Sequence, residues 1–234
     1  MDVTTNILEQ QYYQEHGLAK DRLALWWYAR VVRALRPQGG RLLDFGCGTG
    51  HLLKRLSSHF EAFGYDAAPH SRHESRANAP EAVILEDWAS LPPESFDIIV
   101  ALHTLEHLSH PLPTVQALIT KLAGGGEFFF VVPHVGGLGH RLKGVRWFAY
   151  RDSTHVSLLS QGEWMMMLRK VGLIVLDVHS DGLWDAPYVR FVPAVLQRML
   201  FGAPAAVQAF WPGRRLFLPA GWGECLIVTA RKPG

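Results

Sequence analysis

Short apolar runs alternate along the chain with longer stretches that are apolar at helical spacing, which predicts strands separated by helices. The expected strands cover residues 41–45, 60–65, 82–85, 96–102, 127–132, 173–178 and 224–230. The expected helices cover residues 18–36, 51–59, 69–77, 111–123 and 160–170. Helices that connect successive strands are typical of parallel sheets. We therefore expect an α/β fold with a doubly wound, seven-stranded and mostly parallel sheet.

Two helix boundaries carry signals of their own. Gly124-Gly125-Gly126 is expected to end the helix at 111–123 before the next strand begins. Ser160 stands three residues before Glu163, the spacing of a capping box at the start of a helix.

The pattern predicts one domain, 1–234, in four parts. A helical cap (1–36) precedes the core (37–181), and the last strand occupies residues 224–231. Residues 182–223 interrupt the alternation of strands and helices. Because this segment is rich in aromatic residues and proline and has no clear polar face, we expect a lid-like, irregular insertion.

Composition and charge narrow the class of protein. Hydrophobic residues make up 48% and charged residues 19%, an ordinary globular balance. The formal net charge is +2 and no stripe of Lys and Arg is present, so we do not expect nucleic acid as a partner.

Cys47 and Cys225 lie far apart, which argues against a disulfide and fits a reducing compartment. Residues 1–11 lack a signal-peptide pattern and no run of about 20 apolar residues occurs. These features predict a cytoplasmic protein and leave its oligomeric state open.

A glycine-rich turn follows the first expected strand. Gly46, Gly48 and Gly50 allow the backbone to turn tightly and to approach a ligand closely at a helix N-terminus. A dinucleotide-binding turn would place its third glycine at position 51, where this chain has His51. Asp44 adds negative charge that disfavours a pyrophosphate and suits a cofactor with a cationic amino group. The turn therefore argues against an NAD-dependent oxidoreductase.

Acidic residues follow the next two expected strands. Asp66 ends the second strand, where a carboxylate can accept hydrogen bonds from both hydroxyls of a ribose. Asp87 and Trp88 follow the third strand, beside the expected position of an adenine. Each feature is common alone, but their order at successive strand ends indicates a nucleotide-like cofactor.

Together these features resemble motifs of class I methyltransferases that use S-adenosylmethionine (SAM), in particular ubiquinone-pathway enzymes and the type 12 small-molecule group. The resemblance covers about residues 37–181 and the last strand, and it implies a Rossmann-like fold with SAM as cofactor. It places the methionine part of SAM at the glycine turn, the ribose at Asp66 and the adenine at Asp87. The cofactor-binding residues that it implies are Asp44, Gly46, Cys47, Gly48, Gly50, Asp66, Ala67, Asp87, Trp88 and His103.

A histidine-rich segment, His103-Thr104-Leu105-Glu106-His107, follows the fourth expected strand. Its letters match the H-x-x-E-H pattern of inverted zinc peptidases, but that pattern needs a helix that presents both histidines. Here the segment lies at a strand end, which disfavours a peptidase.

Three roles remain open for this segment. It is similar to the E-x-x-E-H segment of ubiquinone-pathway and small-RNA 2′-O-methyltransferases, which helps to hold a divalent cation, although His103 stands where they have a glutamate. His155 matches their downstream histidine, so His103, Glu106, His107 and His155 are candidate ligands of a divalent metal such as zinc or iron. Alternatively, His103, His107 or His155 acts as general base without a metal. In the third role, Glu106 and His107 only brace the loop.

The acceptor is expected beyond the carboxyl ends of the strands. Three segments can reach this edge: one has Tyr12, Tyr13 and His16; the second, at 133–152, has Arg141, Lys143, Arg146, Trp147 and Tyr150; the third has Trp184, Tyr188, Phe191, Phe201, Phe210, Trp211 and Phe217. Some of these aromatic residues are expected to pack against the sheet and others to cover a hydrophobic acceptor. Arg190, Arg198, Arg214 and Arg215 are interleaved with them, which suits peripheral contact with a membrane.

The predicted activity is SAM-dependent O-methylation of a small aromatic or lipid-like acceptor. The alternatives are an RNA 2′-O-methyltransferase-like enzyme and a SAM-binding module without catalytic activity.

Overall fold

A computed structural model describes residues 23–211 and 216–234 of the chain. Its strands are β1 (Arg41–Phe45), β2 (Glu61–Tyr65), β3 (Val83–Ile84), β4 (Phe96–Leu102), β5 (Leu122–Pro133), β6 (Ile174–Ser180) and β7 (Cys225–Arg231). Its α-helices are α2 (Leu23–Leu35), α3 (His51–Leu56), α4 (Pro69–Asn78), α5 (Pro111–Lys121), α6 (Leu138–Lys143), α7 (Gln161–Lys170) and α8 (Ala194–Phe210). Four 3₁₀ turns complete the set: η1 (Leu105–His107), η2 (Gly144–Arg146), η3 (Phe148–Tyr150) and η4 (Ala220–Trp222).

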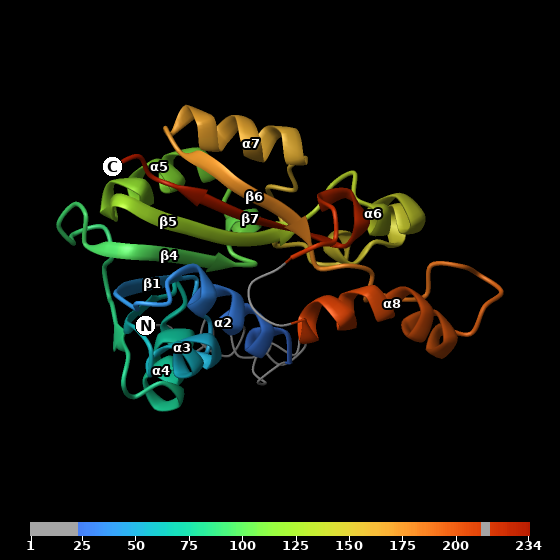
Figure 1. Ribbon diagram of the computed structural model, residues 1–234, viewed down its shortest axis with the longest axis horizontal. Helices are drawn as coiled ribbons and strands as arrows, with labels where there is room; N and C mark the ends of the chain where they lie inside the picture. Colours follow the sequence, from blue (N-terminus) through green and yellow to red (C-terminus); the bar gives the residue numbers. More distant parts are fainter. Residues whose placement is uncertain (1–22, 212–215) are drawn as a thin grey trace.

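The seven strands form one sheet in the order β3-β2-β1-β4-β5-β7-β6, and this confirms the predicted fold class (Figure 1). The pairs among β1 to β5 are parallel, whereas β7 runs antiparallel to both of its neighbours. Strand order reverses between β1 and β4. From β1 the chain adds β2 and β3 on one side, and then returns to add β4 and β5 on the other side. Ligands of such sheets bind at the carboxyl ends of the strands at this switch point.

Both faces of the sheet are covered, which explains why the central strands carry apolar residues on both faces. Leu42 and Phe129 pack toward α2 and α3 on one face. Leu43 and Phe128 pack toward α5 and α7 on the other. Figure 1 shows the two helical layers, with α2, α3 and α4 on one side of the sheet and α5 and α7 on the opposite side.

The glycine triplet at 124–126 does not separate a helix from a strand. Helix α5 ends at Lys121, and β5 already begins at Leu122, which pairs with Phe96. Gly125 donates a backbone hydrogen bond to Lys232, at the end of the chain, and Gly126 accepts one from it. The glycines therefore form an irregular part of β5, and the expected end of the helix was wrong.

The segment at 182–223 is not irregular throughout, because it contains the 17-residue helix α8. The capping box of α7 is present, with the Ser160 hydroxyl accepting from the Glu163 backbone and the Glu163 carboxylate accepting from Ser160 N. Both cysteines are free and buried. Within the described ranges, no helix is long and apolar enough to cross a bilayer.

Candidate active site

The glycine-rich turn connects β1 to α3 and has a positive φ angle at each of its three glycines. Gly46, Gly48 and Gly50 have φ angles of 81°, 53° and 81°, which L residues rarely adopt. A Cβ atom on Gly46 would lie 2.2 Å from Thr104 Oγ1, in the loop that follows β4. A Cβ atom on Gly50 would lie 2.9 Å from Ser75 Cα. Glycine is therefore required here both by the backbone conformation and by close packing against the histidine-rich loop.

Asp44 lies at the carboxyl end of β1 with 2% of its surface exposed. Burial, with a contribution from the charge of Asp66, raises the pKa of Asp44 to about 8. A cationic group placed beside this carboxyl would favour its ionised form and lower the pKa again. The position therefore fits the cationic amino group of an amino-acid moiety.

Asp66 ties the end of β2 to the glycine-rich turn. Its Oδ2 accepts a hydrogen bond from Gly48 N and its Oδ1 one from Ala68 N, both at 2.9 Å. Each carboxylate oxygen has a second lone pair, so Asp66 keeps acceptor capacity for a ligand. The neighbouring Ala67 is exposed.

An aromatic group lies beside these carboxylates. The Phe45 ring stacks on Tyr65 at 5.7 Å and meets the edge of Trp88 at 5.2 Å. Asp87 is exposed, and its Oδ1 accepts from Ala89 N. Phe45 and Tyr65 were not predicted as site residues, although both are aromatic and occupy the last positions of β1 and β2. Phe45 is buried, whereas Tyr65 and Trp88 are half-buried and suit stacking with a planar base.

The histidine-rich segment begins with a strained residue. His103 follows β4 directly and has φ 51°, which is uncommon for a residue with a side chain. Its Nδ1 lies 3.3 Å from Glu106 Oε1. Both Glu106 carboxylate oxygens are buried and accept no hydrogen bond from the described residues.

The loop that precedes α7 is held against this segment. Val156 N and Ser157 N both donate to the Glu106 carbonyl, at 3.0 and 2.9 Å. Consequently one ligand atom from each of Glu106, His107 and His155 lies within 4.8 Å of the other two. His103 contacts Glu106 but stands outside this group of three.

The two imidazoles are oriented by their Nδ1 atoms. His155 Nδ1 donates to the Ala149 carbonyl at 2.8 Å. The Thr154 hydroxyl donates to Asp152, so it accepts from His107 Nδ1 at 2.9 Å. In the neutral ring Nε2 then carries the lone pair that a metal or a proton can bind, and Nε2 of His155 lies 3.7 Å from Asp152 Oδ2. Burial lowers the pKa of His107, which favours the neutral ring.

Asp152 and Thr154 were missed as site residues in the sequence. Their only signal was the sequence Asp152-Ser153-Thr154 directly before the candidate ligand His155.

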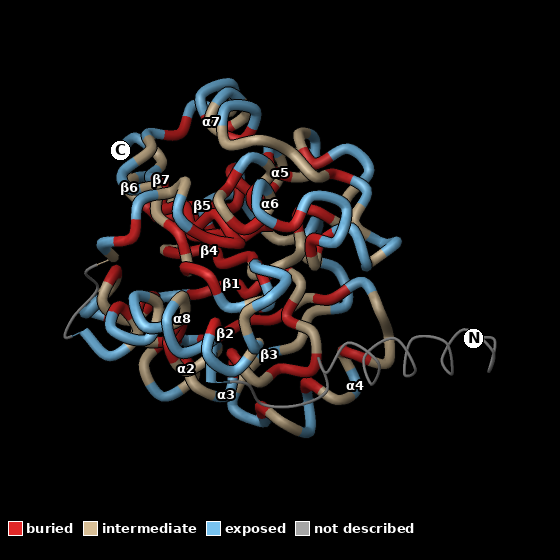
Figure 2. Tube along the Cα trace, turned by 90° about the vertical axis from the view of Figure 1, so that its right-hand side faces the viewer, coloured by how far each residue is buried: buried red, intermediate tan, exposed pale blue. Residues whose placement is uncertain are grey.

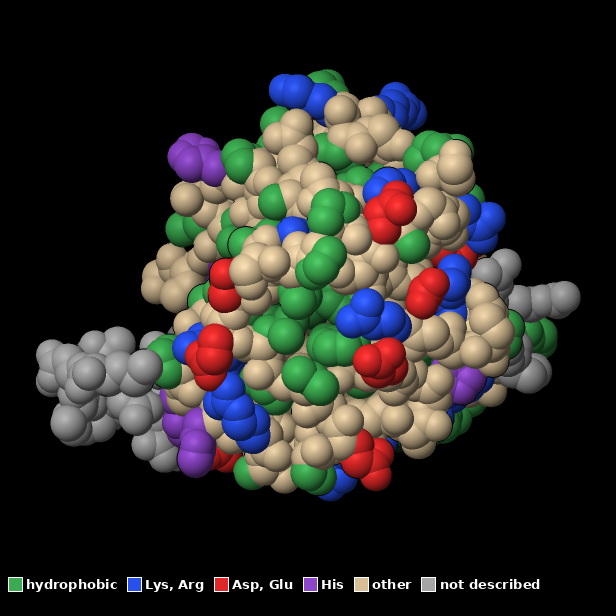
Figure 3. Space-filling model, turned by 90° about the vertical axis from the view of Figure 1, so that its left-hand side faces the viewer, with side chains coloured by type: hydrophobic (Ala, Val, Ile, Leu, Met, Phe, Trp, Pro, Cys, Tyr) green, Lys and Arg blue, Asp and Glu red, His purple; other side chains and the backbone are tan. Residues whose placement is uncertain are grey.

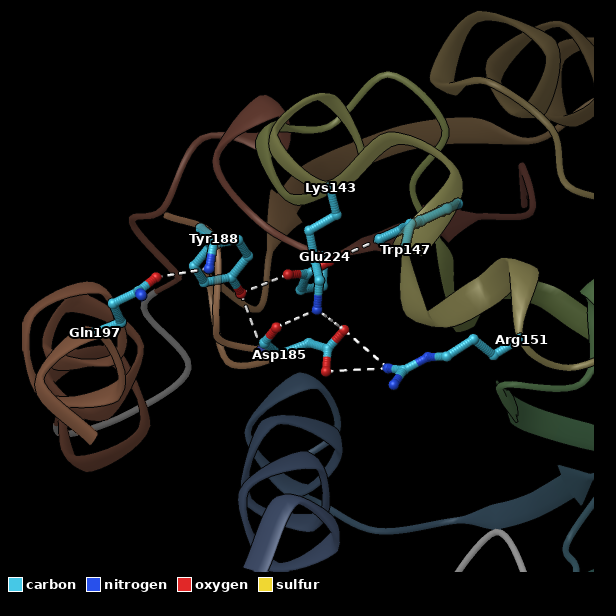
Figure 4. Close-up of polar contacts among 7 residues, drawn as sticks. All are labelled: Lys143, Trp147, Arg151, Asp185, Tyr188, Gln197 and Glu224. Carbon is cyan, nitrogen blue, oxygen red and sulfur yellow. Dashed lines mark hydrogen bonds and ion pairs between the residues drawn. The ribbon is translucent and has the colours of Figure 1, made fainter. Parts of the chain in front are cut away.

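Two candidate substrate residues instead hold a buried carboxylate, as Figure 4 shows. Glu224, next to β7, accepts from Trp147 Nε1 at 2.7 Å and from the Tyr188 hydroxyl. Burial raises the pKa of Glu224 and, together with the neighbouring carboxylate, that of Tyr188. Trp147 and Tyr188 therefore have structural contacts that join the loops on either side of β7.

Asp185 makes a second junction in the same network (Figure 4). Its carboxylate pairs with Lys143 and, at 3.0 Å, with Arg151. Gln197 of α8 accepts from Tyr188 N at 2.6 Å and so joins the helix to the network.

The remaining candidate substrate residues are distributed over several environments. Arg141, Arg146 and Tyr150 are exposed, and the Tyr150 hydroxyl lies 3.0 Å from His140 Nε2. Trp184, Phe191, Phe210, Trp211 and Phe217 are exposed, whereas Phe201 is half-buried. Tyr12, Tyr13, His16, Arg214 and Arg215 lie outside the described residues.

The doubly wound sheet, the left-handed glycine turn and the carboxylates at the ends of β1 and β2 define the class of SAM-dependent methyltransferase folds. A family model described as a methyltransferase domain matches residues 11–178. The chain belongs to this methyltransferase family.

Individual relatives agree with this assignment. The ubiquinone biosynthesis O-methyltransferase of Neisseria meningitidis serogroup C is 32% identical over 104 residues, which cover 40% of this chain and 44% of that protein. The enzyme of the same name from Paracidovorax citrulli is 32% identical over 134 residues, covering 53% of this chain and 54% of that protein. The chain thus matches about half the length of these curated relatives.

Solved structures share the fold at lower sequence identity. A SAM-dependent methyltransferase from Thermotoga maritima has a TM-score of 0.65 at 18% identity, with coverage of 97% of this chain and 98% of that one. A TehB-like SAM-dependent methyltransferase from Corynebacterium glutamicum has a TM-score of 0.61 at 17% identity, with coverage of 99% and 100%.

Proposed function

We propose that the protein transfers the methyl group of SAM to an acceptor bound at the carboxyl edge of the sheet. The observation that carries this proposal is the close packing of Gly46 against Thr104. It makes the predicted cofactor turn and the histidine-rich segment direct neighbours, so a cofactor and an acceptor on either side would be within transfer distance.

The residues at the strand ends fit SAM. Asp44 would bind its cationic amino group, Asp66 its ribose hydroxyls, and the aromatic group of Phe45, Tyr65 and Trp88 its adenine. When bound, the cofactor supplies an electrophilic methyl group on a sulfonium. The remaining contribution of the protein is alignment and exclusion of water.

The acceptor class we propose is a hydroxyl on a small aromatic or lipid-like molecule. The likeness to relatives named ubiquinone biosynthesis O-methyltransferases supports this class. Such a hydroxyl must lose its proton. Nε2 of His107 or His155 can accept it when the ring is neutral and its proton is on Nδ1, the atom that makes the hydrogen bond described above.

The same residues also suit a divalent metal. Two imidazole nitrogens and a buried carboxylate without hydrogen-bond donors form a donor set typical of zinc or iron. Glu106, His107 and His155, whose ligand atoms lie within 4.8 Å of one another, would hold the ion after moving somewhat closer together. A metal held there would polarise the acceptor oxygen and lower the pKa of its hydroxyl.

Binding and turnover separate these alternatives. We expect calorimetry to show SAM or its demethylated product binding at about micromolar concentration or somewhat above and NAD not binding. Tighter binding of NAD would overturn the proposal. Turnover is then measured with simple phenols, prenylated phenols and, for the RNA alternative, short RNA. Binding without turnover of any acceptor would favour the non-catalytic module.

Variants distinguish the base from the metal. If histidine is the base, His107→Ala lowers kcat by roughly 10²–10⁴-fold and a chelator has no effect. If a metal is required, a chelator abolishes turnover and elemental analysis finds an ion. His110→Ala is the matched control, because His110 is exposed on the same loop. Equal activity of both variants would leave only the bracing role for His107.

A further inference from the structure

Helix α8 has its polar and apolar faces reversed relative to an ordinary surface helix. Its buried residues are two glutamines, Gln197 and Gln208. Its outward face carries Val195, Leu196, Met199, Leu200, Val207 and Phe210, which are 46–69% exposed. Figure 2 shows α8 as a largely exposed element beside the carboxyl edge of the sheet.

The glutamines fix this orientation. Gln197 Oε1 accepts from Tyr188 N and Val189 N, and its Nε2 donates to the Val189 carbonyl. Gln208 Oε1 accepts from Phe217 N and Leu218 N, both at 2.8 Å. Turning the apolar face inward would break these bonds and leave buried backbone groups without partners. The exposed apolar face is therefore a stable feature of the fold.

Aromatic side chains continue this surface beyond the ends of the helix. Phe191, before the helix, is 89% exposed, and Trp211, directly after it, is 46% exposed. Exposed apolar surfaces of this extent mark contact sites. Tryptophan and phenylalanine beside an apolar helical face are typical of the interface between water and lipid.

The described charged side chains of this surface have one sign. Arg190 and Arg198 are exposed, and residues 186–211 and 216–223 contain neither Asp nor Glu. By contrast, the opposite end of the molecule shows acidic and basic side chains interspersed (Figure 3).

A basic hollow adjoins the end of α8. Arg30 donates to the carbonyls of Ala209 and Trp211, at 2.5 and 2.6 Å, and Trp26 lies 6.1 Å from the Phe210 ring. The hollow has a volume of about 290 Å³, and it is lined by Trp26, Ala29, Arg30, Arg33, Lys54, Arg55 and Ser58. Its size and four cationic residues suit a phosphate group.

We propose that α8 and its flanking aromatic residues lie on an anionic lipid bilayer, with the basic hollow facing the phosphates of the lipid headgroups. A second copy of the chain fits this surface less well, because a symmetric dimer would place arginines against arginines. The contact brings the carboxyl edge of the sheet next to the bilayer, where a lipid-like acceptor would be concentrated. It does not depend on methyl transfer, and it can be measured without turnover.

Co-sedimentation with vesicles tests the proposal, using phosphatidylcholine with and without phosphatidylglycerol. We expect binding to the anionic vesicles that weakens as salt is raised. Met199→Glu should weaken it by roughly tenfold or more, because the charge lies in the apolar contact. Met166→Glu is the matched control, since Met166 on α7 is 68% exposed and Met199 is 69% exposed. Lys54→Glu, at the exposed edge of the hollow, should reduce binding to the anionic vesicles.

Several outcomes would overturn the proposal. The wild-type protein could fail to sediment with anionic vesicles, or Met199→Glu could bind as well as Met166→Glu. If the protein bound neutral and anionic vesicles equally well, neither the arginines nor the basic hollow would contribute to binding. A wild-type dimer that Met199→Glu converts to a monomer would assign the surface to self-association instead. Circular dichroism and SAM binding of each variant verify that the fold is retained.

Discussion

Asp44 is a single residue whose burial conflicts with its charge. In the cofactor-free protein, burial raises its pKa to about 8, whereas an unfolded chain has an ordinary value near 4. The folded state therefore holds a proton that the unfolded state has already released over this range. Its contribution to stability is fully present below about pH 4 and is lost as pH rises through about 8.

Asp44→Asn should remove this pH dependence. Between pH 6 and 9, we expect the melting temperature of the cofactor-free wild type to fall by a few degrees more than that of the variant. SAM affinity should rise with pH in the wild type relative to Asp44→Asn, because the amino group binds the ionised carboxylate. Parallel curves for both proteins, in melting and in calorimetry, would exclude an ionisable role for Asp44.

We predict that Thr154 is a positioning residue, because its hydroxyl links His107 Nδ1 to the Asp152 carboxylate. Thr154→Val keeps the shape and removes the hydroxyl, and Thr154→Ser restores the hydroxyl. We expect the valine variant to lower kcat by roughly 10–100-fold with little change in the KM for SAM, and the serine variant to recover most of the rate. A valine variant with normal kcat would show that the orientation of His107 does not matter.

The sequence predicted individual site residues unevenly. Asp44 could be recognised because it precedes the glycine turn near the end of a strand, and Asp66 because it directly follows the next strand; both are local patterns. Tyr65 could not be assigned to the site, because an aromatic residue at a strand end looks the same whether it faces the core or a ligand. Thr154 acts through a contact between residues 47 positions apart, and spacing alone does not reveal such a contact.

At the scale of elements, the turn after β1 and the loop after β4 form one packed unit. Gly46 and Gly125 have similar φ angles, 81° and 72°. A Cβ atom on Gly46 would clash with Thr104, whereas a Cβ atom on Gly125 would have nothing within 4 Å. Gly125→Ala should therefore cost about 1–2 kcal/mol of backbone strain. Gly46→Ala should cost more in urea unfolding and should weaken SAM binding at least about tenfold, the equivalent of about 1.4 kcal/mol. Similar losses in both variants would mean that the contact with Thr104 is easily relaxed.

Strands were easier to predict than the helix in the C-terminal segment. A strand buried on both faces is continuously apolar, and β4 was predicted with its observed bounds. Helix α8 gave no such signal, because its buried face holds glutamines that bond to distant backbone groups. The glycines at 124–126 were wrongly predicted to end a helix for a similar reason. Gly125 and Gly126 form backbone hydrogen bonds with Lys232, which is distant in the sequence.

At the scale of the whole molecule, the sheet gathers these parts at one edge. β7 runs antiparallel, so its beginning lies at the carboxyl ends of the parallel strands, and Glu224 can hold Trp147 and Tyr188 there. Three features consequently lie around the same edge of the sheet: the cofactor turn, the histidine-rich segment and helix α8 with its exposed apolar face (Figures 1 and 2).

The contact between Gly46 and Thr104 also has a thermodynamic consequence. A ligand that orders the turn should restrict the loop after β4, because the Gly46 backbone packs closely against the Thr104 side chain. Ligands bound on the two sides of this contact are then energetically linked. By reciprocity, the factor by which the first improves the affinity of the second equals the factor by which the second improves the affinity of the first.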